Sequence, residues 1–371
     1  MSKKIMLCAN RDFVLYNFRF ELIEKMIIQG NDVYICLPYG PKVDLMTKAG
    51  AKFVPINIDG RGTNPIVDYG MVLKYIKAFK DIKPDVILTY TTKVCIYAGI
   101  VARKLHIPYI ENVSGLGSAV EKPGILQPLM ISLYKMAIKD AKCVYFLNDE
   151  NERFFIEHQI DCIKKKRIPG SGVNLKKWIY LEYPNDNEIH FLFIARIIRE
   201  KGIEQYLYAA SEIKKRYSNV YFHILGPCDG DYENVINENV KNGIVKYHGM
   251  VQDTGEYLRF AHCLVHPSFY PEGISNVLLE ACASGRPIIT TDRSGCREVV
   301  DDGVNGYMVK CQDGVGLVNA IEKFLGLSWN DKKKMGLAAR KKVELEFDRQ
   351  IVIDDYMDEI DQINKDNCFV Y

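Results

Sequence analysis

The chain of 371 residues is 48% hydrophobic and 26% charged, and its formal net charge is +2. These values are those of an ordinary globular protein, and the length allows two domains that each bury a core. No apolar run approaches the ~18 residues of a membrane-spanning helix, so we expect none. We also expect no nucleic-acid partner.

The charge is unevenly distributed along the chain. Residues 1–170 contain 25 Lys and Arg against 17 Asp and Glu, whereas the remainder contains 24 against 30. A basic first half favours an anionic partner, such as a lipid surface or a phosphorylated acceptor. Ordinary scatter of surface charge fits the numbers equally well.

The eleven cysteines occur singly, without a Cys-x-x-Cys pair or a Cys/His cluster at metal-ligand spacing. This usage indicates a reducing compartment, buried thiols and neither a disulfide framework nor a zinc site. The five apolar residues 5–9 precede a polar segment, so they are expected to form a first strand and not a signal peptide.

The first half alternates short apolar strands with helices. Strands are expected at 5–9, 33–37, 52–58, 86–90, 108–113 and 144–148, and helices at 18–29, 42–49, 69–80, 96–105 and 127–141. This alternation predicts a doubly wound parallel sheet. The loop 115–126 follows a strand, where ligands bind in such sheets. Together with the Lys-bearing helix after it, the loop could lie on a membrane surface, or that helix could simply pack on the core.

The alternation restarts after a polar segment at 182–187, which we interpret as an interdomain linker. Strands are expected at 189–194, 220–225, 245–249, 263–266 and 288–291, and helices at 203–217, 232–242, 254–260, 315–324, 332–346 and 352–363. Two such units imply two similar α/β lobes with a cleft between them. The basic run 164–167 is interpreted as a solvated loop, and His262 and His266 as core or turn residues.

The stretch from Pro271 to Pro287 contains two glutamates, Glu272 and Glu280, with helical apolar spacing between them. Within one helix, eight residues would separate the two carboxylates by about 12 Å. That distance is too long for two carboxylates acting on one bond, which lie about 5–9 Å apart in glycosidases. It suits the two ends of an extended ligand. Ser275 and Asn276 would lie in the first turn, where a helix favours an anion.

A second candidate phosphate site follows the strand 189–194. Arg196 and Lys201 lie in the loop that leads to a helix at Gly202, and both are suitable counter-charges for phosphate. A charged loop of this kind is usually just solvated. Because this loop and Ser275 both follow strands of one sheet, however, both sites can face one cleft.

These motifs together resemble glycosyltransferase family 4. The resemblance covers essentially the whole chain and rests on an ordered series of segments: Ile168 to Asn174, Ala195-Arg196, Lys201-Gly202, Leu225-Gly226, His248-Gly249, Pro267-Ser268, Glu272-x7-Glu280-Ala281, and Gly295 to Gly306. Leu88 to Lys93 and Ser114 to Gly117 look like the subgroup that builds bacterial surface polysaccharides on a lipid carrier. The ordered set is specific, although no single piece is.

The resemblance implies a GT-B fold, in which two Rossmann-like domains face a central cleft. It implies a retaining transfer from a nucleotide sugar, with a UDP-sugar as donor and no metal or other cofactor required. Residues 1–180 would bind the acceptor, residues 188–346 would bind the donor, and the tail 347–371 would return to the first domain.

The resemblance also implies roles for single residues. Arg196 and Lys201 would hold and neutralise the diphosphate, Glu280 would accept hydrogen bonds from the ribose, and Glu272 would fix the donor hexose. The remaining donor contacts are Gly273, Ile274, Ser275 and Asn276 at the phosphate and sugar, and Gly226, His248, Gly249 and Val251 at the nucleoside.

The acceptor side departs from the family pattern. The histidine that many relatives have near residues 112–115 is absent, and Glu111 and Ser114 lie there instead. The usual Gly-Gly loop after the first strand is replaced by residues 10–13. The candidate acceptor contacts are Arg11, Asp12, Arg19, Lys93, Glu111, Ser114, Gly115 and Gly117. Asp12 is a candidate base, and Arg11, Arg19 and Lys93 are candidate phosphate ligands; each of these could instead be solvated or structural.

The leading hypothesis is therefore a glycosyltransferase that extends a polyprenyl-diphosphate-linked glycan. Its expected location is cytoplasmic and peripheral, at the inner face of the cytoplasmic membrane, with contact through the basic first half. The alternatives are a UDP-sugar-binding scaffold without catalytic activity and a UDP-GlcNAc 2-epimerase-like enzyme. The sequence does not indicate the sugar, the linkage or the identity of the acceptor.

Overall fold

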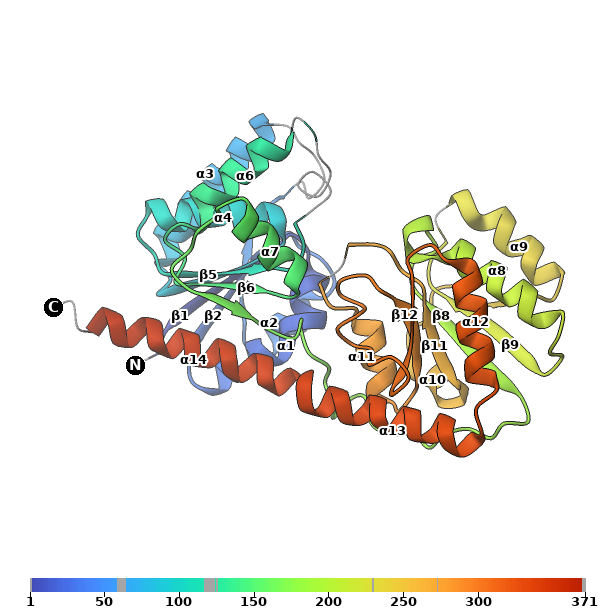
Figure 1. The fold of residues 1–371 in the computed structure, drawn as a ribbon. Helices are drawn as coiled ribbons and strands as arrows, with labels where there is room; N and C mark the ends of the chain where they lie inside the picture. Colours follow the sequence, from blue (N-terminus) through green and yellow to red (C-terminus); the bar gives the residue numbers. More distant parts are fainter. Residues whose placement is uncertain are drawn as a thin grey trace. The chain divides into compact units, whose positions relative to one another are not determined.

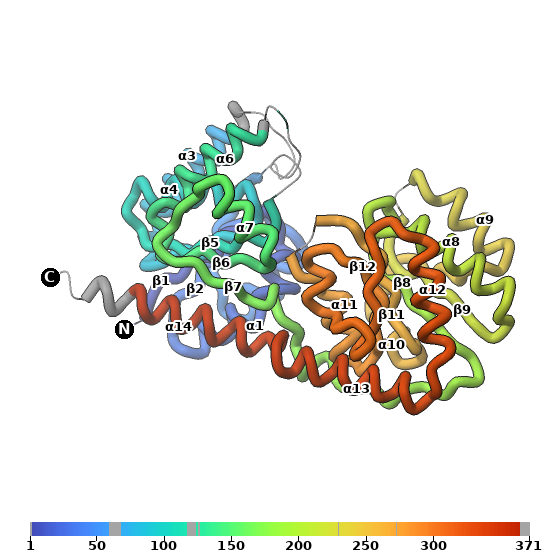
Figure 2. Tube along the Cα trace, viewed as in Figure 1, coloured from blue at the N-terminus to red at the C-terminus, as the bar shows by residue number. Residues whose placement is uncertain are grey.

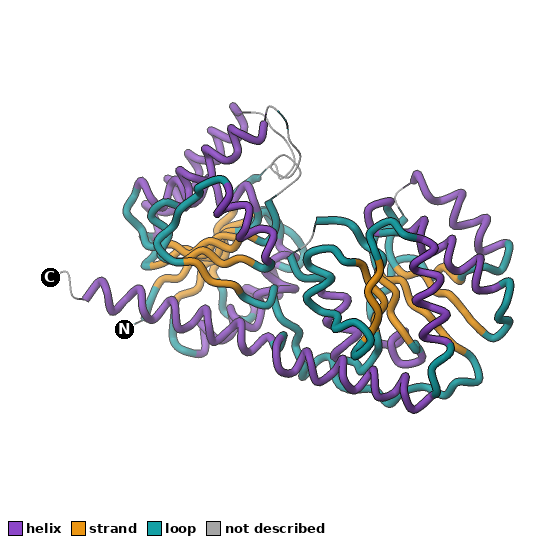
Figure 3. Tube along the Cα trace, in the orientation of Figure 1, coloured by secondary structure: helices purple, strands orange, loops and turns teal. Residues whose placement is uncertain are grey.

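The computed structural model describes residues 2–58, 65–116, 124, 126–228, 230–271 and 273–368. The chain divides into two compact units: residues 1–171 together with 350–371, and residues 172–349. Each unit is a parallel sheet between layers of helices (Figures 1 and 3). No helix in the described ranges is both long and apolar enough to cross a bilayer.

The first unit contains a seven-stranded sheet in the order β3-β2-β1-β4-β5-β6-β7, and all its neighbouring strands are parallel. The strands are β1 (Lys4–Cys8), β2 (Asp32–Leu37), β3 (Lys52–Pro55), β4 (Val86–Tyr90), β5 (Tyr109–Val113), β6 (Cys143–Phe146) and β7 (Lys165–Arg167). The strand order reverses between β1 and β4, and this point of a doubly wound sheet is where ligands bind.

Helices cover both faces of this sheet. They are α1 (Asp12–Ile28), α2 (Val43–Lys48), α3 (Pro65–Ile82), α4 (Thr92–Lys104), α6 (Leu126–Ile138), α7 (Asp149–Glu157) and α14 (Arg349–Cys368). Apolar residues of α1, α2 and α14 pack on one face, and those of α3, α4, α6 and α7 pack on the other. Helices α1 and α4 begin several residues earlier than predicted, within a few residues of the ends of β1 and β4.

The second unit contains a six-stranded parallel sheet in the order β10-β9-β8-β11-β12-β13. The strands are β8 (Ile189–Ile194), β9 (Val220–Leu225), β10 (Lys246–Tyr247), β11 (Cys263–His266), β12 (Ile288–Thr291) and β13 (Gly306–Val309). The helices are α8 (Ile203–Lys214), α9 (Glu233–Lys241), α10 (Gly255–Phe260), α11 (Asn276–Ala283), α12 (Gly314–Leu325) and α13 (Trp329–Glu346), with short 3-10 turns η1 (Arg199–Lys201) and η2 (Gly230–Tyr232). The strand order reverses between β8 and β11.

The C-terminal helix α14 lies against the first sheet and completes its core (Figure 2). Its buried Tyr356 packs on Tyr145 with ring centroids 4.6 Å apart. The Nζ atom of Lys166 lies 2.7 Å from carboxylate oxygens of both Asp355 and Glu359. The basic run that we interpreted as a solvated loop is therefore largely the edge strand β7, and acidic side chains of α14 neutralise part of it.

This return of α14 removes most of the charge asymmetry seen along the sequence. The first unit contains 26 Lys and Arg against 23 Asp and Glu, and the second contains 23 against 24. The two units thus carry net charges of +3 and −1. A strongly basic first domain, inferred from the linear sequence, does not exist in the folded chain.

The polar segment 182–187 belongs to the second unit and is not a free linker. The fully buried Arg286 donates from its guanidinium to the carbonyl oxygens of Leu181 and Glu182, both at 2.9 Å. Lys332 forms an ion pair of 2.8 Å with Asp186. A run of turn-forming residues indicates an irregular backbone, but it does not reveal whether that backbone is tied to a core.

Candidate functional site

The loops that follow β8 and β11 lie side by side where the order of the second sheet reverses, and backbone contacts join them. The amide of Phe269 donates to the carbonyl of Glu200 at 2.9 Å. Gly202 has a φ of +78°, and a Cβ there would lie 2.1 Å from the carbonyl oxygen of Pro267. Only glycine fits this position, because both the left-handed backbone and the close approach exclude a side chain.

Two cations occupy this junction. The charged ends of Arg196 and Lys201 lie 5.8 Å and 4.8 Å from the ring centroid of Tyr270, so one aromatic ring faces both. Arg196 is exposed, whereas Lys201 is half-buried. Burial, reinforced by the positive charge of Arg196, lowers the pKa of Lys201 to about 8. An anion stabilises a partly desolvated cation more strongly than it stabilises a fully solvated cation. The pair is therefore suited to neutralising a phosphate group.

Helix α11 begins beside these cations. Ser275 is its N-cap residue, and Asn276 is the first helical residue. The amide of Ser275 donates to Gly295 at 2.8 Å, and its buried hydroxyl lies 3.3 Å from Nε2 of His266. Ser275 is therefore engaged within the protein, and its carbonyl also accepts from the amides of Leu278 and Leu279 at 3.2 and 3.3 Å. Burial and the nearby Lys201 lower the pKa of His266 to about 3, so this ring is neutral.

The other predicted residues of this stretch have different surroundings. Gly273 directly precedes the buried Ile274, which belongs to the core beneath α11. Glu280 is half-buried on α11, and burial raises its pKa to about 7, although Lys177 and Arg349 oppose this shift. Glu272 lies outside the described residues. Because α11 begins only at Asn276, the estimate of about 12 Å, which assumed one continuous helix between the glutamates, does not apply.

The residues predicted to bind the nucleoside lie at the carboxyl ends of β9 and β10. The amide of Gly226 donates to the carbonyl of Gly249 at 2.8 Å, and the amide of His248 donates to Ile224 at 3.0 Å. Val251, which is partly buried, packs against the core near α10 and α11. Strands β8, β9 and β10 are neighbours, and adjacent strands lie about 4.8 Å apart. His248 therefore lies roughly 10 Å across the same edge from Arg196, which suits a nucleoside beside a diphosphate.

On the first sheet, several candidate acceptor residues are engaged within the protein. Asp12 accepts hydrogen bonds from the amides of Phe13 and Lys42, both at 2.8 Å. Lys93 forms an ion pair of 2.8 Å with Asp68. Arg11 is exposed at the start of α1. Asp12 and Lys93 are thus held by contacts within the first unit.

Two of the candidate acceptor residues are buried in the core of the first unit. Arg19 is only 4% exposed, and its guanidinium lies 5.2 Å from the ring centroid of Tyr90 and 5.5 Å from that of Tyr356. Glu111 is fully buried in mid-strand, and a Cβ on Gly99 would lie 2.0 Å from its Oε1 atom. Burial raises the pKa of Glu111 well above its usual value, so its carboxyl group is neutral. Both side chains therefore pack inside the first unit, and an acceptor outside it would not meet them in this conformation.

The remaining acceptor candidates lie in the loop after β5. Ser114 and Gly115 are half-buried, and the hydroxyl of Thr92 donates to the carbonyl of Gly115 at 3.1 Å, which joins this loop to α4. Gly117 lies outside the described residues. Within the described ranges, no three His, Cys, Asp or Glu side chains are grouped so that they could hold a metal ion.

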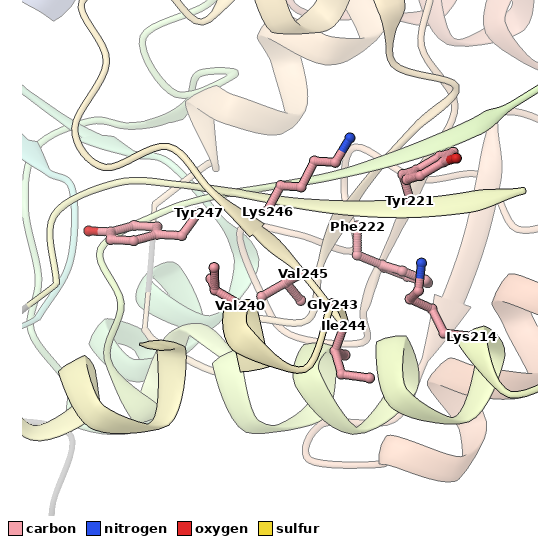
Figure 4. A pocket seen from close by; sticks show the side chains of 9 residues that line it. All are labelled: Lys214, Tyr221, Phe222, Val240, Gly243, Ile244, Val245, Lys246 and Tyr247. Carbon is pink, nitrogen blue, oxygen red and sulfur yellow. The ribbon is translucent and has the colours of Figure 1, made fainter. Parts of the chain in front are cut away.

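Sequence reasoning missed two features of the second unit. Tyr270, whose ring faces both cations, was not predicted, although an aromatic residue so close to the glutamate motif was a usable signal. A hollow of about 440 Å³ at the outer edge of β9 and β10 was also not expected; Figure 4 shows its lining residues, which include Tyr221, Lys214 and Lys246. None of the predicted site residues lines this hollow.

Two parallel α/β units, with a cation pair and a helix N-terminus where one sheet reverses its order, form the arrangement expected of a GT-B glycosyltransferase that uses a nucleotide sugar. The chain belongs to the group 1 glycosyltransferases, which form family 4. The model of "Glycosyl transferases group 1" matches residues 188–326, and that of "Glycosyl transferase 4-like" matches residues 4–148. The predicted fold class, family and enzyme class are confirmed.

Relatives span nearly the whole chain at low identity. The N,N'-diacetylbacillosaminyl-diphospho-undecaprenol alpha-1,3-N-acetylgalactosaminyltransferase of Campylobacter jejuni is 26% identical, covering 95% of this chain and 96% of its own length. The capsular polysaccharide biosynthesis glycosyltransferase CapM of Staphylococcus aureus is 25% identical, covering 89% and 90%. Among solved structures, Anabaena HepE in complex with UDP and glucose superposes with a TM-score of 0.77 at 16% identity, covering 96% of this chain and 98% of that one.

Proposed function

We propose that this protein is a retaining glycosyltransferase that moves a hexose or N-acetylhexosamine from a UDP-sugar to a polyprenyl-diphosphate-linked glycan. The observation that carries the proposal is the pairing of Arg196 with a partly desolvated Lys201 beside the N-terminus of α11. The names of the Campylobacter and Staphylococcus relatives support a lipid-linked acceptor and a role in surface polysaccharide synthesis.

The diphosphate would lie between Arg196, Lys201 and the first turn of α11. As the bond to the sugar breaks, negative charge grows on the leaving phosphate, and the two cations stabilise it without a metal ion. Glu280 would accept hydrogen bonds from the ribose hydroxyls, and Gly226, His248, Gly249 and Val251 would surround the base. Glu272, with Gly273 and Asn276, would position the hexose.

The acceptor would bind at the first unit, near Arg11, Asp12, Ser114 and Gly115 at the carboxyl ends of β1 and β5. Because the net charge of this unit is only +3, membrane contact would depend on a local surface. Helix α6 offers one, since Leu129 and Met136 are 55% and 48% exposed beside exposed Lys135. Such a face suits peripheral contact with the inner leaflet.

The test is nucleotide release. The protein is incubated with a panel of UDP-sugars and a lipid-diphosphate glycan, and free UDP and the extended glycan are measured. We expect UDP release that depends on the acceptor and on one preferred sugar. Tight UDP binding without release from any donor would favour a scaffold, and release of free hexosamine with UDP in the absence of acceptor would favour an epimerase.

Membrane contact is tested separately by sedimentation with vesicles containing anionic lipid. Replacing Leu129 and Met136 with Ser should reduce the bound fraction and leave UDP release from a detergent-soluble acceptor unchanged. Equal sedimentation of the variant and the parent protein would contradict contact through α6.

A further inference from the structure

Three histidines form a continuous hydrogen-bonded row across the second sheet. Nδ1 of His190 lies 2.9 Å from Nε2 of His223, and Nδ1 of His223 lies 3.0 Å from Nε2 of His248. The row begins on β8, crosses β9 and ends just after β10. It therefore links the amino-terminal part of the sheet to the edge where the proposed nucleoside site lies.

The three rings are neutral near pH 7. Burial lowers the pKa of His223 to about 3, with smaller effects from its two histidine neighbours and from Lys246. Burial also lowers the pKa of His190 and of His248. A neutral imidazole carries one N–H and one bare nitrogen. His223 must therefore donate in one of its two links and accept in the other, so the row has a direction.

Glu188 determines that direction at the outer end of the row. Its Oε2 atom lies 3.4 Å from Nε2 of His190, and its Oε1 atom accepts from the hydroxyl of Tyr221 at 3.2 Å. Tyr221 stacks on the ring of His190 with centroids 5.1 Å apart and also lines the hollow in Figure 4. Because a carboxylate accepts hydrogen bonds and does not donate them, Nε2 of His190 carries the proton.

The remaining protons follow from this one. Nδ1 of His190 is bare and accepts from Nε2–H of His223. Nδ1 of His223 is then bare and accepts from Nε2–H of His248. The proton of His248 is thus held inside the row, and its Nδ1 atom is a bare acceptor. In the part of the chain that the structure describes, no hydrogen-bond partner faces this atom.

We propose that Glu188, acting through His190 and His223, fixes His248 as a hydrogen-bond acceptor and thereby selects nucleotides whose base has a ring N–H on its pairing edge. This inference rests on the proposed function, which supplies the position of the base at His248. Uracil would donate its N3–H to the Nδ1 atom of His248. The N3 atom of cytosine carries a lone pair instead, so it would face the lone pair of Nδ1 without a hydrogen bond. Glu188 and the two inner histidines are positioning residues, because they act through His248.

The expected selectivity is about tenfold or more for UDP over CDP, since the wrong base leaves buried acceptors facing each other. Exposed Glu188 allows a direct test, because Glu188→Lys places a donor beside Nε2 of His190. That nitrogen must then be bare, and each proton in the row moves to the opposite nitrogen. His248 becomes a donor at Nδ1, so the preference for UDP over CDP should fall at least several-fold or reverse.

The experiment has two readouts on the full chain. Nitrogen chemical shifts of the imidazoles report which ring nitrogen of His248 carries the proton, and titration calorimetry gives the affinities for UDP and CDP. The matched control is Glu182→Lys, which makes the same charge change at a side chain that is 82% exposed and outside the row. We expect bare Nδ1 in the parent and the control, protonated Nδ1 in Glu188→Lys, and loss of base preference only in Glu188→Lys.

The possible failures are distinguishable. Protonation of Nδ1 of His248 in the parent protein would overturn this inference. It would also be overturned if Glu188→Lys reverses the row but leaves the ratio of the UDP and CDP affinities unchanged. In either case the proposed function stands. Failure of the parent protein to bind any nucleotide would overturn the proposed function, and the inference with it.

Discussion

Loss of the proton from Lys201 should lower kcat/KM for the UDP-sugar donor in mildly alkaline solution. The pKa of this lysine is lowered to about 8, chiefly by burial, whereas an exposed lysine titrates near ~10.4. The proposed mechanism needs the ammonium form to bind and neutralise the diphosphate. A side chain that is cationic at pH 7 should therefore be mostly neutral at about pH 9.

The size of the effect follows from the titration. The pH dependence of kcat/KM reports groups of the free enzyme, so kcat/KM for the donor should fall about tenfold per pH unit above about 8. A bound diphosphate favours the charged form of Lys201, so kcat should be maintained to a higher pH than kcat/KM. Lys201→Ala removes the charge at every pH and should lower turnover by about 10²-fold or more.

The assay is UDP release at limiting donor and saturating acceptor, between about pH 6.5 and 10. Lys201→Arg is the matched variant, because arginine stays charged throughout this range. Its profile should be flat where the profile of the parent protein declines, whatever its absolute rate. A parent profile that is flat to about pH 9.5, or an equal decline in the arginine variant, would refute the assignment of Lys201.

Three further predictions concern other parts of the fold. Because burial raises the pKa of Glu280 to about 7, UDP should bind more tightly as the pH rises from about 6 to 7, below the range in which Lys201 loses its proton, and binding should release a proton; calorimetry in two buffers should detect this, and Glu280→Gln should abolish it. Gly202→Ala should cost clearly more unfolding free energy than Gly243→Ala, since both glycines have positive φ but only a Cβ at 202 would meet a backbone oxygen, at 2.1 Å; equal denaturation midpoints would contradict the steric argument. Tyr356→Ala should destabilise the first unit by about 3–5 kcal/mol, whereas exposed Asp358→Asn should change stability little.

The chain order of most strands and helices, and the placement of Arg196 and Lys201 after β8, could be predicted from sequence, whereas α7, β7 and β13 were not predicted. Parallel strands all end at one edge, so any residue just after a strand, such as Arg196, must lie at that edge. Lys201 and the start of α11 follow by the same rule. These predictions depended on the order and direction of the strands and not on any side-chain contact.

Burial was the property that sequence reasoning could not supply. Arg19 and Glu111 have the residue types expected of ligands, yet both pack inside the first unit. Their neighbours there, Tyr356 and Gly99, are 337 and 12 positions away, and no local pattern reveals such contacts. The histidine row was missed for the same reason, because His190, His223 and His248 come from three separate strands or loops.

The return of α14 to the first sheet has a consequence for the order in which the protein can fold during synthesis. The core around β1 and β4 includes six apolar residues from Val352 to Ile363, which are synthesised after the whole second unit. The second unit, residues 172–349, contains its whole core and can fold before α14 is synthesised. The first unit cannot complete its core until α14 is available, and until then part of its apolar face is uncovered. A truncated chain would therefore be most exposed to aggregation in the domain that is made first.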